Sequence, residues 1–145
     1  MAKVQHVARY IIEQMGPMTT MKLQKLVYYC QSWSLAWEEE PLFQEDFQAW
    51  ANGPVCVELF REHRGMFKVG NDFLSEYETD NVFNDDQLET IGIVIEDYGD
   101  DEPYELSELT HKERPWKETR GSLAPGENSN AVIPKDLMQE YYGGI

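Results

Sequence analysis

The sequence predicts a mainly α-helical fold, a single compact helical domain over residues 1–145 with room for a small β hairpin. Apolar residues recur at helical spacing in several segments, and Gly, Pro and Asn separate these segments. The length is typical of one domain, and 41% of the residues are hydrophobic, which is enough to build a core. Neither an internal repeat nor a linker divides the chain, so we expect one domain.

The first predicted helix lies in residues 4–15. Its apolar residues stand at positions i, i+3, i+4, i+7, i+8 and i+11, namely Val4, Val7, Ala8, Ile11, Ile12 and Met15. Gly16-Pro17 ends this pattern. Polar and charged residues interrupt the apolar ones, which is not the composition of a signal peptide. We therefore expect an amphipathic helix that buries one side.

A second, longer helix is predicted from Thr19 or Thr20, either of which can cap it, to residues 38–41, whose sequence is EEEP. Apolar residues occur on more than one side of this segment, at Met21, Leu23, Leu26, Val27, Tyr28, Cys30, Trp33, Leu35 and Trp37. A helix that is apolar on several sides is packed by neighbours on several sides. We expect it to be the central helix of the fold.

The middle of the chain is less regular. Residues 42–50 lack helical spacing and are expected to form a short strand or an extended arm. The sequence Asn52-Gly53-Pro54 resembles a turn, a cap and a first helical residue, which predicts a helix over residues 54–63. Residues 65–83 are expected to be irregular, with at most a short strand.

Three further helices are predicted in the second half of the chain. Asp85 or Asp86 is expected to cap a helix that ends at Gly99. Pro103 can open a short helix, and Pro134 can open the last one, because proline is favoured in the first helical turn. These elements complete the mainly helical prediction.

The net charge of −15, with an isoelectric point near 4.4, argues against direct binding to nucleic acid or to an anionic membrane, since each requires a positive surface. No Lys or Arg occurs between Lys68 and Lys112. That span carries fourteen acidic residues: Asp72, Glu76, Glu78, Asp80, Asp85, Asp86, Glu89, Glu96, Asp97, Asp100, Asp101, Glu102, Glu105 and Glu108. Such a run is either a solvated face or a docking surface for a basic partner.

The remaining composition favours a cytoplasmic protein without a cofactor. No apolar window approaches the roughly 18 residues of a membrane-spanning helix. Cys30 and Cys56 lie in apolar surroundings without CxxC spacing, which is typical of buried thiols in a reducing compartment. The three histidines lack the spacing of a metal site, and no glycine-rich phosphate motif is present. We expect neither a metal nor a cofactor.

Residues 106–116, LSELTHKERPW, are the segment most suggestive of a functional site. In a structural interpretation, Pro115 halts any helix, His111 bonds a carbonyl, and Trp116 buries a large area with its indole N–H on a carbonyl. In a catalytic one, Cys56 is a nucleophile activated at a helix start, with His111 as base and Glu113 as orienting group. The structural interpretation is favoured, since Cys56 lies among apolar residues.

Three blocks in order together resemble the Panacea domain, the SocA-like and phage-associated family of antitoxins. They are MKLQKLVYYCQ at 21–31, PLFQEDFQAWANGPVCVELF at 41–60, and LSELTHKERPW at 106–116, followed by an Ile-Pro and a Tyr-Tyr pair. The departures are Cys30 and Cys56, where small or aliphatic residues are more usual, and the strongly acidic segment 72–102. The combination of blocks is more specific than any one of them.

The resemblance implies an antitoxin that neutralises a cognate protein toxin by direct binding, with the toxin expected to be encoded by a neighbouring gene. Some relatives deliver their toxin to a protease, so a protease adaptor is an alternative, as is an acidic mimic of nucleic acid. A small hydrolase using Cys56 or His111 is the less favoured reading. No catalytic residues transfer. The motif positions are Lys22, Leu23, Lys25, Leu26, Trp50, Gly53, Pro54, His111, Glu113, Pro115 and Trp116. Trp33, Trp116, Tyr141 and Tyr142 are candidate interface anchors.

Overall fold

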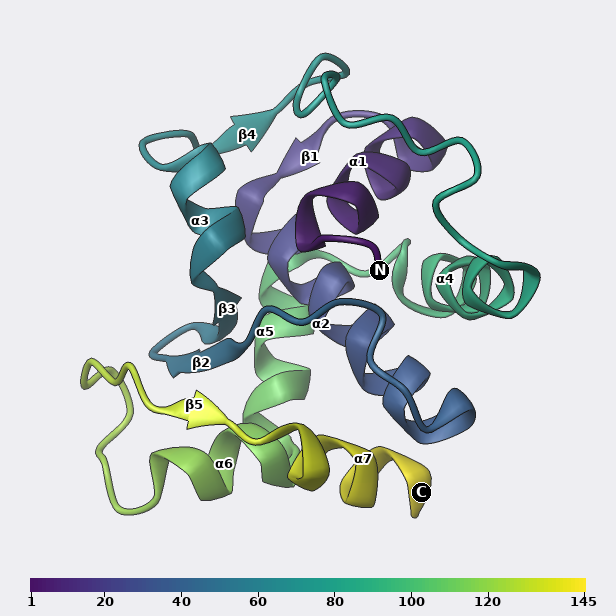
Figure 1. Ribbon diagram of the computed structural model, residues 1–145. Coiled ribbons are helices and arrows are strands. Elements are labelled where there is room, and N and C mark those ends of the chain that lie inside the picture. The colour runs from purple at the N-terminus through teal and green to yellow at the C-terminus, as the bar shows by residue number, and fades with distance from the viewer.

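A computed structural model describes all residues 1–145 and shows seven helices with short strands at one side (Figure 1). The predicted mainly α-helical fold with a small β element is confirmed. The helices are α1 Val4–Met15, α2 Thr20–Glu38, α3 Val57–His63, α4 Asp85–Tyr98, α5 Pro103–Lys112, α6 Arg114–Arg120 and α7 Lys135–Gly143. None of them is both long enough and apolar enough to cross a membrane.

The predicted amphipathic character of α1 is confirmed. Its residues Val4, Val7, Ala8, Ile11 and Ile12 are all buried. The helix ends at Gly16, whose φ of +88° lies in the region that favours glycine. The apolar side of α1 packs on α2 and α3.

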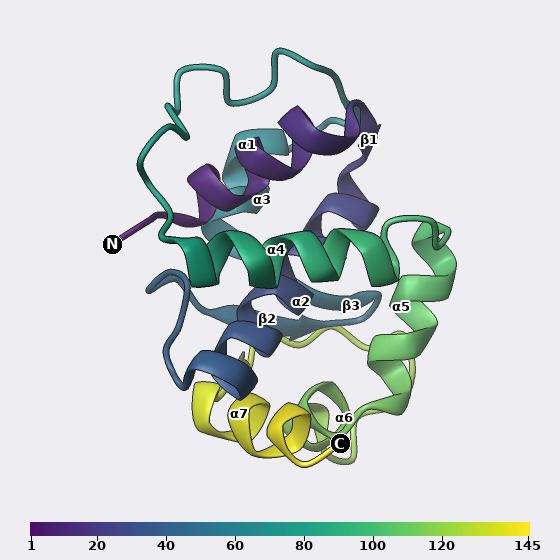
Figure 2. The ribbon, with the colours of Figure 1, turned by 90° about the vertical axis from the view of Figure 1, so that its right-hand side faces the viewer.

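Helix α2 is the central element, as the sequence predicts. Thr19 rather than Thr20 caps it, because the Thr19 hydroxyl oxygen accepts the Lys22 backbone N–H at 3.2 Å. Every residue from 23 to 32 is buried. Helices α4, α5 and α7 and strand β3 pack around it, and Figure 2 shows α4 running across it. This helix therefore forms the interior of the fold.

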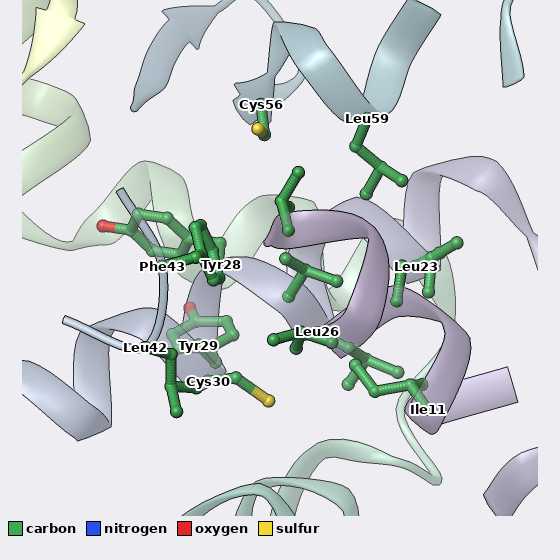
Figure 3. Packing of buried hydrophobic residues seen from close by; sticks show 14 of the residues in the cluster. Ile11, Leu23, Leu26, Tyr28, Tyr29, Cys30, Leu42, Phe43, Cys56 and Leu59 are labelled. Carbon is green, nitrogen blue, oxygen red and sulfur yellow. The ribbon is translucent and has the colours of Figure 1, made fainter. Parts of the chain in front are cut away.

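A core of 30 buried residues surrounds α2. Figure 3 shows Leu23 and Leu26 of α2 lying between Ile11 of α1 and Leu59 of α3. Contacts of this kind supply most of the stabilisation of a small domain, at about 25 cal/mol per Å² of buried apolar surface. The core fixes where α2 and α5 lie, and side chains of both helices bond the candidate site.

The strands form a small antiparallel sheet and a separate pair. Strand β2 (Phe47–Trp50) pairs with β3 (Gly53–Cys56) on one side and with β5 (Val132–Ile133) on the other, giving the order β3-β2-β5. Strand β1 (Met18–Thr19) pairs with β4 (Lys68–Val69). The expected β hairpin is thus β2–β3, joined by the turn residues Ala51 and Asn52.

The predicted helix over residues 54–63 is wrong at its start, since residues 53–56 are strand β3 and α3 begins only at Val57. The cause is a residue that lies far away in the sequence. The Gln24 side-chain oxygen accepts the Cys56 N–H at 2.9 Å, and its nitrogen donates to the Cys56 carbonyl at 3.1 Å. Pairing with β2 and these two bonds together hold the backbone extended.

One boundary prediction in the second half also needs correction, and a second is incomplete. Helix α4 is capped by Asn84, not by Asp85 or Asp86: the Asn84 side chain accepts the Gln87 N–H at 2.8 Å, and the Gln87 side chain accepts the Asn84 N–H at 2.9 Å. Helix α5 ends at Lys112, shortly before Pro115, as predicted, but Pro115 also lies in the first turn of a further helix, α6, where a missing N–H costs nothing. The predicted helices at Pro103 and after Pro134 are confirmed.

Candidate functional site

The three sequence blocks meet at the β2–β3 hairpin. Lys25 of α2 donates to the Pro54 carbonyl at 3.2 Å, and Ser107 of α5 donates to the Asn52 carbonyl at 2.5 Å. The Trp116 indole N–H of α6 donates to the Trp50 carbonyl at 2.8 Å. Side chains from two distant segments thus bond the carbonyls of a third, and together they fix the conformation of the turn.

Gly53 is required where the hairpin passes α2 and α5. Its φ is +118°, a value that side chains with a Cβ rarely adopt. A Cβ at this position would lie 2.5 Å from Lys25 Cε and 2.9 Å from Thr110 Oγ1. The backbone therefore approaches both neighbours more closely than any other residue would allow.

Trp116 is held on several sides. Its ring stacks on His111, with centroids 3.9 Å apart and planes 14° apart, and the Arg120 guanidinium lies 4.9 Å from the ring centroid. Arg120, itself buried, donates to the carbonyls of Ala49, Ala124 and Glu127 at 2.7–3.1 Å. The predicted indole–carbonyl bond is present. Burial, with the positive charges of Lys25 and Arg120, lowers the pKa of His111, so this imidazole is neutral at pH 7.

Glu113 is buried without a cation. Its Oε1 accepts the hydroxyls of Tyr29 at 2.7 Å and Tyr142 at 2.8 Å, and the Tyr28 and Tyr142 hydroxyl oxygens lie 3.1 Å apart. Burial raises the pKa of the Glu113 carboxyl. No local sequence pattern identifies these partners, which lie 84 and 29 residues away. This carboxyl joins α7 and α2 to the junction of α5 and α6.

In the structure no hydrogen bond joins Cys56, His111 and Glu113 to one another. Cys56 is fully buried, and burial raises the pKa of its thiol to about 12, whereas a nucleophilic cysteine needs a lowered pKa. The Glu113 oxygen is bonded to tyrosines, and the His111 Nε2 is buried without a hydrogen-bond partner. The three side chains do not form a relay.

The remaining motif positions and proposed anchors are mostly structural in their contacts. Lys22 donates to the Gly99 carbonyl at 2.5 Å, and Pro54 and Pro115 are buried. Two candidate anchors offer a partner little surface to contact, since Trp116 is only 8% exposed and Tyr142 only 1% exposed.

The indoles at the end of α2 are more accessible. Trp33 is partly buried and donates to the Tyr98 hydroxyl at 2.9 Å. Its ring stacks on that of Trp37, with centroids 4.9 Å apart, and Trp37 is 46% exposed. The hydrogen bond of Trp33 joins this pair to α4, since Tyr98 is the last residue of that helix.

The acidic span between Lys68 and Lys112 is a solvated surface. All fourteen acidic residues except Asp101 are exposed. None of them forms a salt bridge, since the three salt bridges of the molecule join Arg9 to Glu13, Arg114 to Glu118, and Lys135 to Asp46. No group of three or more His, Cys, Asp or Glu side chains is arranged to hold a metal ion. No salt bridge within the chain therefore pairs the negative charges of this surface.

We expect Trp116→Phe to destabilise the fold by about 1–2 kcal/mol, because the Trp50 carbonyl loses its indole donor while an aromatic ring still packs there. Urea denaturation followed by circular dichroism measures this. Trp37→Phe is the matched control, since Trp37 is exposed and its indole bonds no protein group, and it should change stability by less than about 0.5 kcal/mol. Equal losses in the two variants would mean that the indole bond contributes nothing.

Comparison with known proteins gives one match. Residues 23–117 match the family model described as "Antitoxin SocA-like, Panacea domain". The matched segment covers more than half of the chain and runs from α2 to the second half of α6, so it contains the hairpin and the side chains that bond it. Neither a curated protein nor a solved structure matches the chain.

Proposed function

The chain belongs to the SocA-like Panacea-domain family of antitoxins, and we propose that it neutralises a cognate protein toxin by binding it directly, without a catalytic step of its own. The family match carries this proposal. The interior of the motif region supports it, because its polar side chains are engaged with hairpin carbonyls and tyrosines rather than with one another as a catalytic relay. We expect the toxin to be encoded by a neighbouring gene.

The acidic surface is the proposed route of approach. It comprises the exposed carboxylates between residues 72 and 108, which lie on α4, α5 and the segments that flank them. Without cations of its own, this surface produces a negative potential that attracts a basic toxin face and accelerates encounter. Binding there covers the basic face and so blocks the toxin's use of it.

The direct test is co-expression with the adjacent reading frame. The neighbour should be toxic when expressed alone, tolerated with this protein, and recovered with it as a stable complex. If tolerance instead required a cellular protease and the toxin disappeared, the protease-adaptor alternative would replace direct neutralisation. Cys56→Ala should keep protecting cells as long as it folds, whereas a cysteine hydrolase would lose all activity.

The charge-led approach makes a kinetic prediction. The association rate constant should fall about tenfold or more from low to physiological salt, because screening acts over a Debye length of about 8–10 Å. The triple variant Glu89→Gln, Glu96→Gln, Asp97→Asn should weaken this dependence, since all three α4 carboxylates are exposed. Stopped-flow measurement with the purified toxin gives both values.

The matched control neutralises three carboxylates elsewhere. Glu38→Gln, Glu39→Gln, Glu40→Gln removes the same charge from exposed residues at the end of α2 and should leave the salt dependence nearly unchanged. An association rate that stays flat from low to high salt would contradict charge-led approach. The stacked pair Trp33 and Trp37 would then be the surface to mutate.

A further inference from the structure

A cleft of about 740 Å³ opens between α2, α3, the β2–β3 hairpin and residues 128–130, and we name it the hairpin cleft. Figure 1 shows the hairpin turn and the loop ahead of β5 at the same side of the molecule. Gln24, Lys25 and His63 line it together with Trp50 and Phe60. Its volume lies in the range of about 300–1,000 Å³ that holds small ligands in proteins.

The hairpin cleft has no carboxylate in its lining, although 27 of the 145 residues are Asp or Glu. A second cleft of about 530 Å³, on the other side of Ala51 and Asn52, is also free of carboxylates and is lined by His111, Lys117 and Arg120. Three of the twelve Lys and Arg residues, namely Lys25, Lys117 and Arg120, therefore line two clefts that hold no carboxylate. Clefts with this lining favour a negatively charged ligand.

The hydrogen bonds of Gln24 determine the tautomer of His63. Because the Gln24 oxygen accepts the Cys56 N–H and its nitrogen donates to the Cys56 carbonyl, the orientation of the amide is fixed. The second hydrogen of that nitrogen points at His63 Nε2, 3.0 Å away, so Nε2 is the acceptor. The proton of the neutral ring then lies on Nδ1, which is buried and has no hydrogen-bond partner.

Lys25 supplies further donors. Its ammonium group makes one hydrogen bond, to the Pro54 carbonyl at 3.2 Å, and has no acidic partner. The stem passes directly beside Gly53, which fixes where the nitrogen lies. Burial lowers the pKa of Lys25 to about 7, because nothing nearby compensates its charge. An anion in the cleft would satisfy both Lys25 and His63, and an unsatisfied buried donor otherwise costs about 1–3 kcal/mol.

The side wall of the cleft is aromatic. Trp50 and Phe60 contact each other edge to face, with centroids 5.0 Å apart, and Phe60 contacts His63 in the same way at 5.5 Å. The hydrogen of the Trp50 indole nitrogen is already bonded to Gln48 at 2.8 Å, so this ring offers an apolar surface rather than a donor. A flat apolar group fits this wall.

We propose that the hairpin cleft binds a small organic carboxylate with a flat apolar body. The carboxylate accepts from Lys25 Nζ, and also from His63 Nδ1 once the side chains that cover this buried nitrogen move to admit the ligand. The body lies on Trp50 and Phe60. A carboxylate suits these two donors because its two oxygens match a lysine and a single imidazole N–H. A phosphate dianion has more charge and more acceptor oxygens than the two donors can bind. The site is independent of the acidic surface proposed to meet the toxin.

The test uses the whole chain and fluorinated probes followed by ¹⁹F NMR. 4-Fluorophenylacetate should bind saturably, and the neutral 4-fluorophenylacetamide should not. Lys25→Met and His63→Phe should each weaken binding of the acid about tenfold or more, since each removes one charge-assisted hydrogen bond. Lys117→Met removes a positive charge from the neighbouring cleft and should leave the affinity nearly unchanged.

Circular dichroism of each variant separates lost binding from lost folding. If one of the variants Lys25→Met and His63→Phe fails to fold, the other still tests the proposal. The proposal is overturned if wild-type protein shows no saturable binding of the acid, or if Lys117→Met weakens it as much as Lys25→Met does. It is also overturned if 4-fluorophenyl phosphate binds more tightly than the carboxylate. Toxin neutralisation is not a readout here, so failure of one proposal leaves the other intact.

Discussion

Replacing Lys25 with Met is expected to raise the free energy of unfolding at pH 7 and to flatten its dependence on pH. Burial holds the pKa of Lys25 at about 7 in the folded protein, against 10.5 for an ordinary lysine. Between these values the unfolded chain binds more protons than the folded one, so the wild-type stability rises with pH. The slope reaches about 1.4 kcal/mol per pH unit, and Met removes it while keeping a similar volume.

The useful window for this measurement runs from pH 7 to 9. Above that, Cys30 and Cys56 oppose the trend, because burial raises their pKa above the ordinary 9.0 and the unfolded thiols release protons first. Urea denaturation at several pH values, compared between the two proteins, isolates the lysine contribution. Lys112→Met, at an exposed position, should leave the slope as in the wild type. A Lys25→Met protein with the wild-type slope would show that Lys25 stays charged when folded.

The second large effect is expected at Gly53. Gly53→Ala should destabilise the protein by about 2–4 kcal/mol, since the new Cβ combines an unfavourable backbone conformation with two close contacts. The Lys25 stem and the Thr110 hydroxyl would both have to move. Lys25 makes a hydrogen bond to the Pro54 carbonyl of the hairpin, and the Thr110 hydroxyl donates to the Ser107 carbonyl within α5. Chemical denaturation gives the loss of stability, and amide exchange at residues 49–56 shows whether the hairpin opens first.

Gly65→Ala separates the effect of the backbone conformation from the effect of the close contacts. Gly65 also has a positive φ, of +84°, but nothing lies within 4 Å of the position that its Cβ would take. The Gly65→Ala variant should therefore be destabilised only by the unfavourable backbone conformation, by about 1 kcal/mol. If Gly65→Ala were as destabilising as Gly53→Ala, the close approach to Lys25 would not be what requires glycine at the hairpin.

The sequence predicts best those helices whose buried residues form an apolar pattern along the chain. Helix α1 shows its buried side as a regular apolar spacing, and α2 shows burial on several sides as apolar residues throughout. Both are local patterns, so no knowledge of distant partners is needed. The sequence predicts that a small hairpin can form but not where its second strand lies, because both strands are short and the second contains proline.

The errors arise where a distant side chain decides the local structure. The hydrogen bonds of Gln24 hold residues 54–56 as a strand where the sequence predicts the start of a helix. Residues 54–56 themselves do not indicate these bonds. Lys25 is a motif position whose burial no local spacing predicts. Glu113 is bonded by tyrosines of α2 and α7 rather than by His111. Each of these depends on a pairing that no local spacing encodes.

The contacts of Glu113 also bear on how the chain folds as it is made. Tyr29 and Glu113 are both synthesised before Tyr142, so the carboxyl lacks one of its two tyrosine donors until α7 has been made. Domains close as units, and this one lacks the helix that packs most extensively on α2 until residues 135–143 have emerged. The central helix is therefore among the first elements to be synthesised and the last to be fully covered.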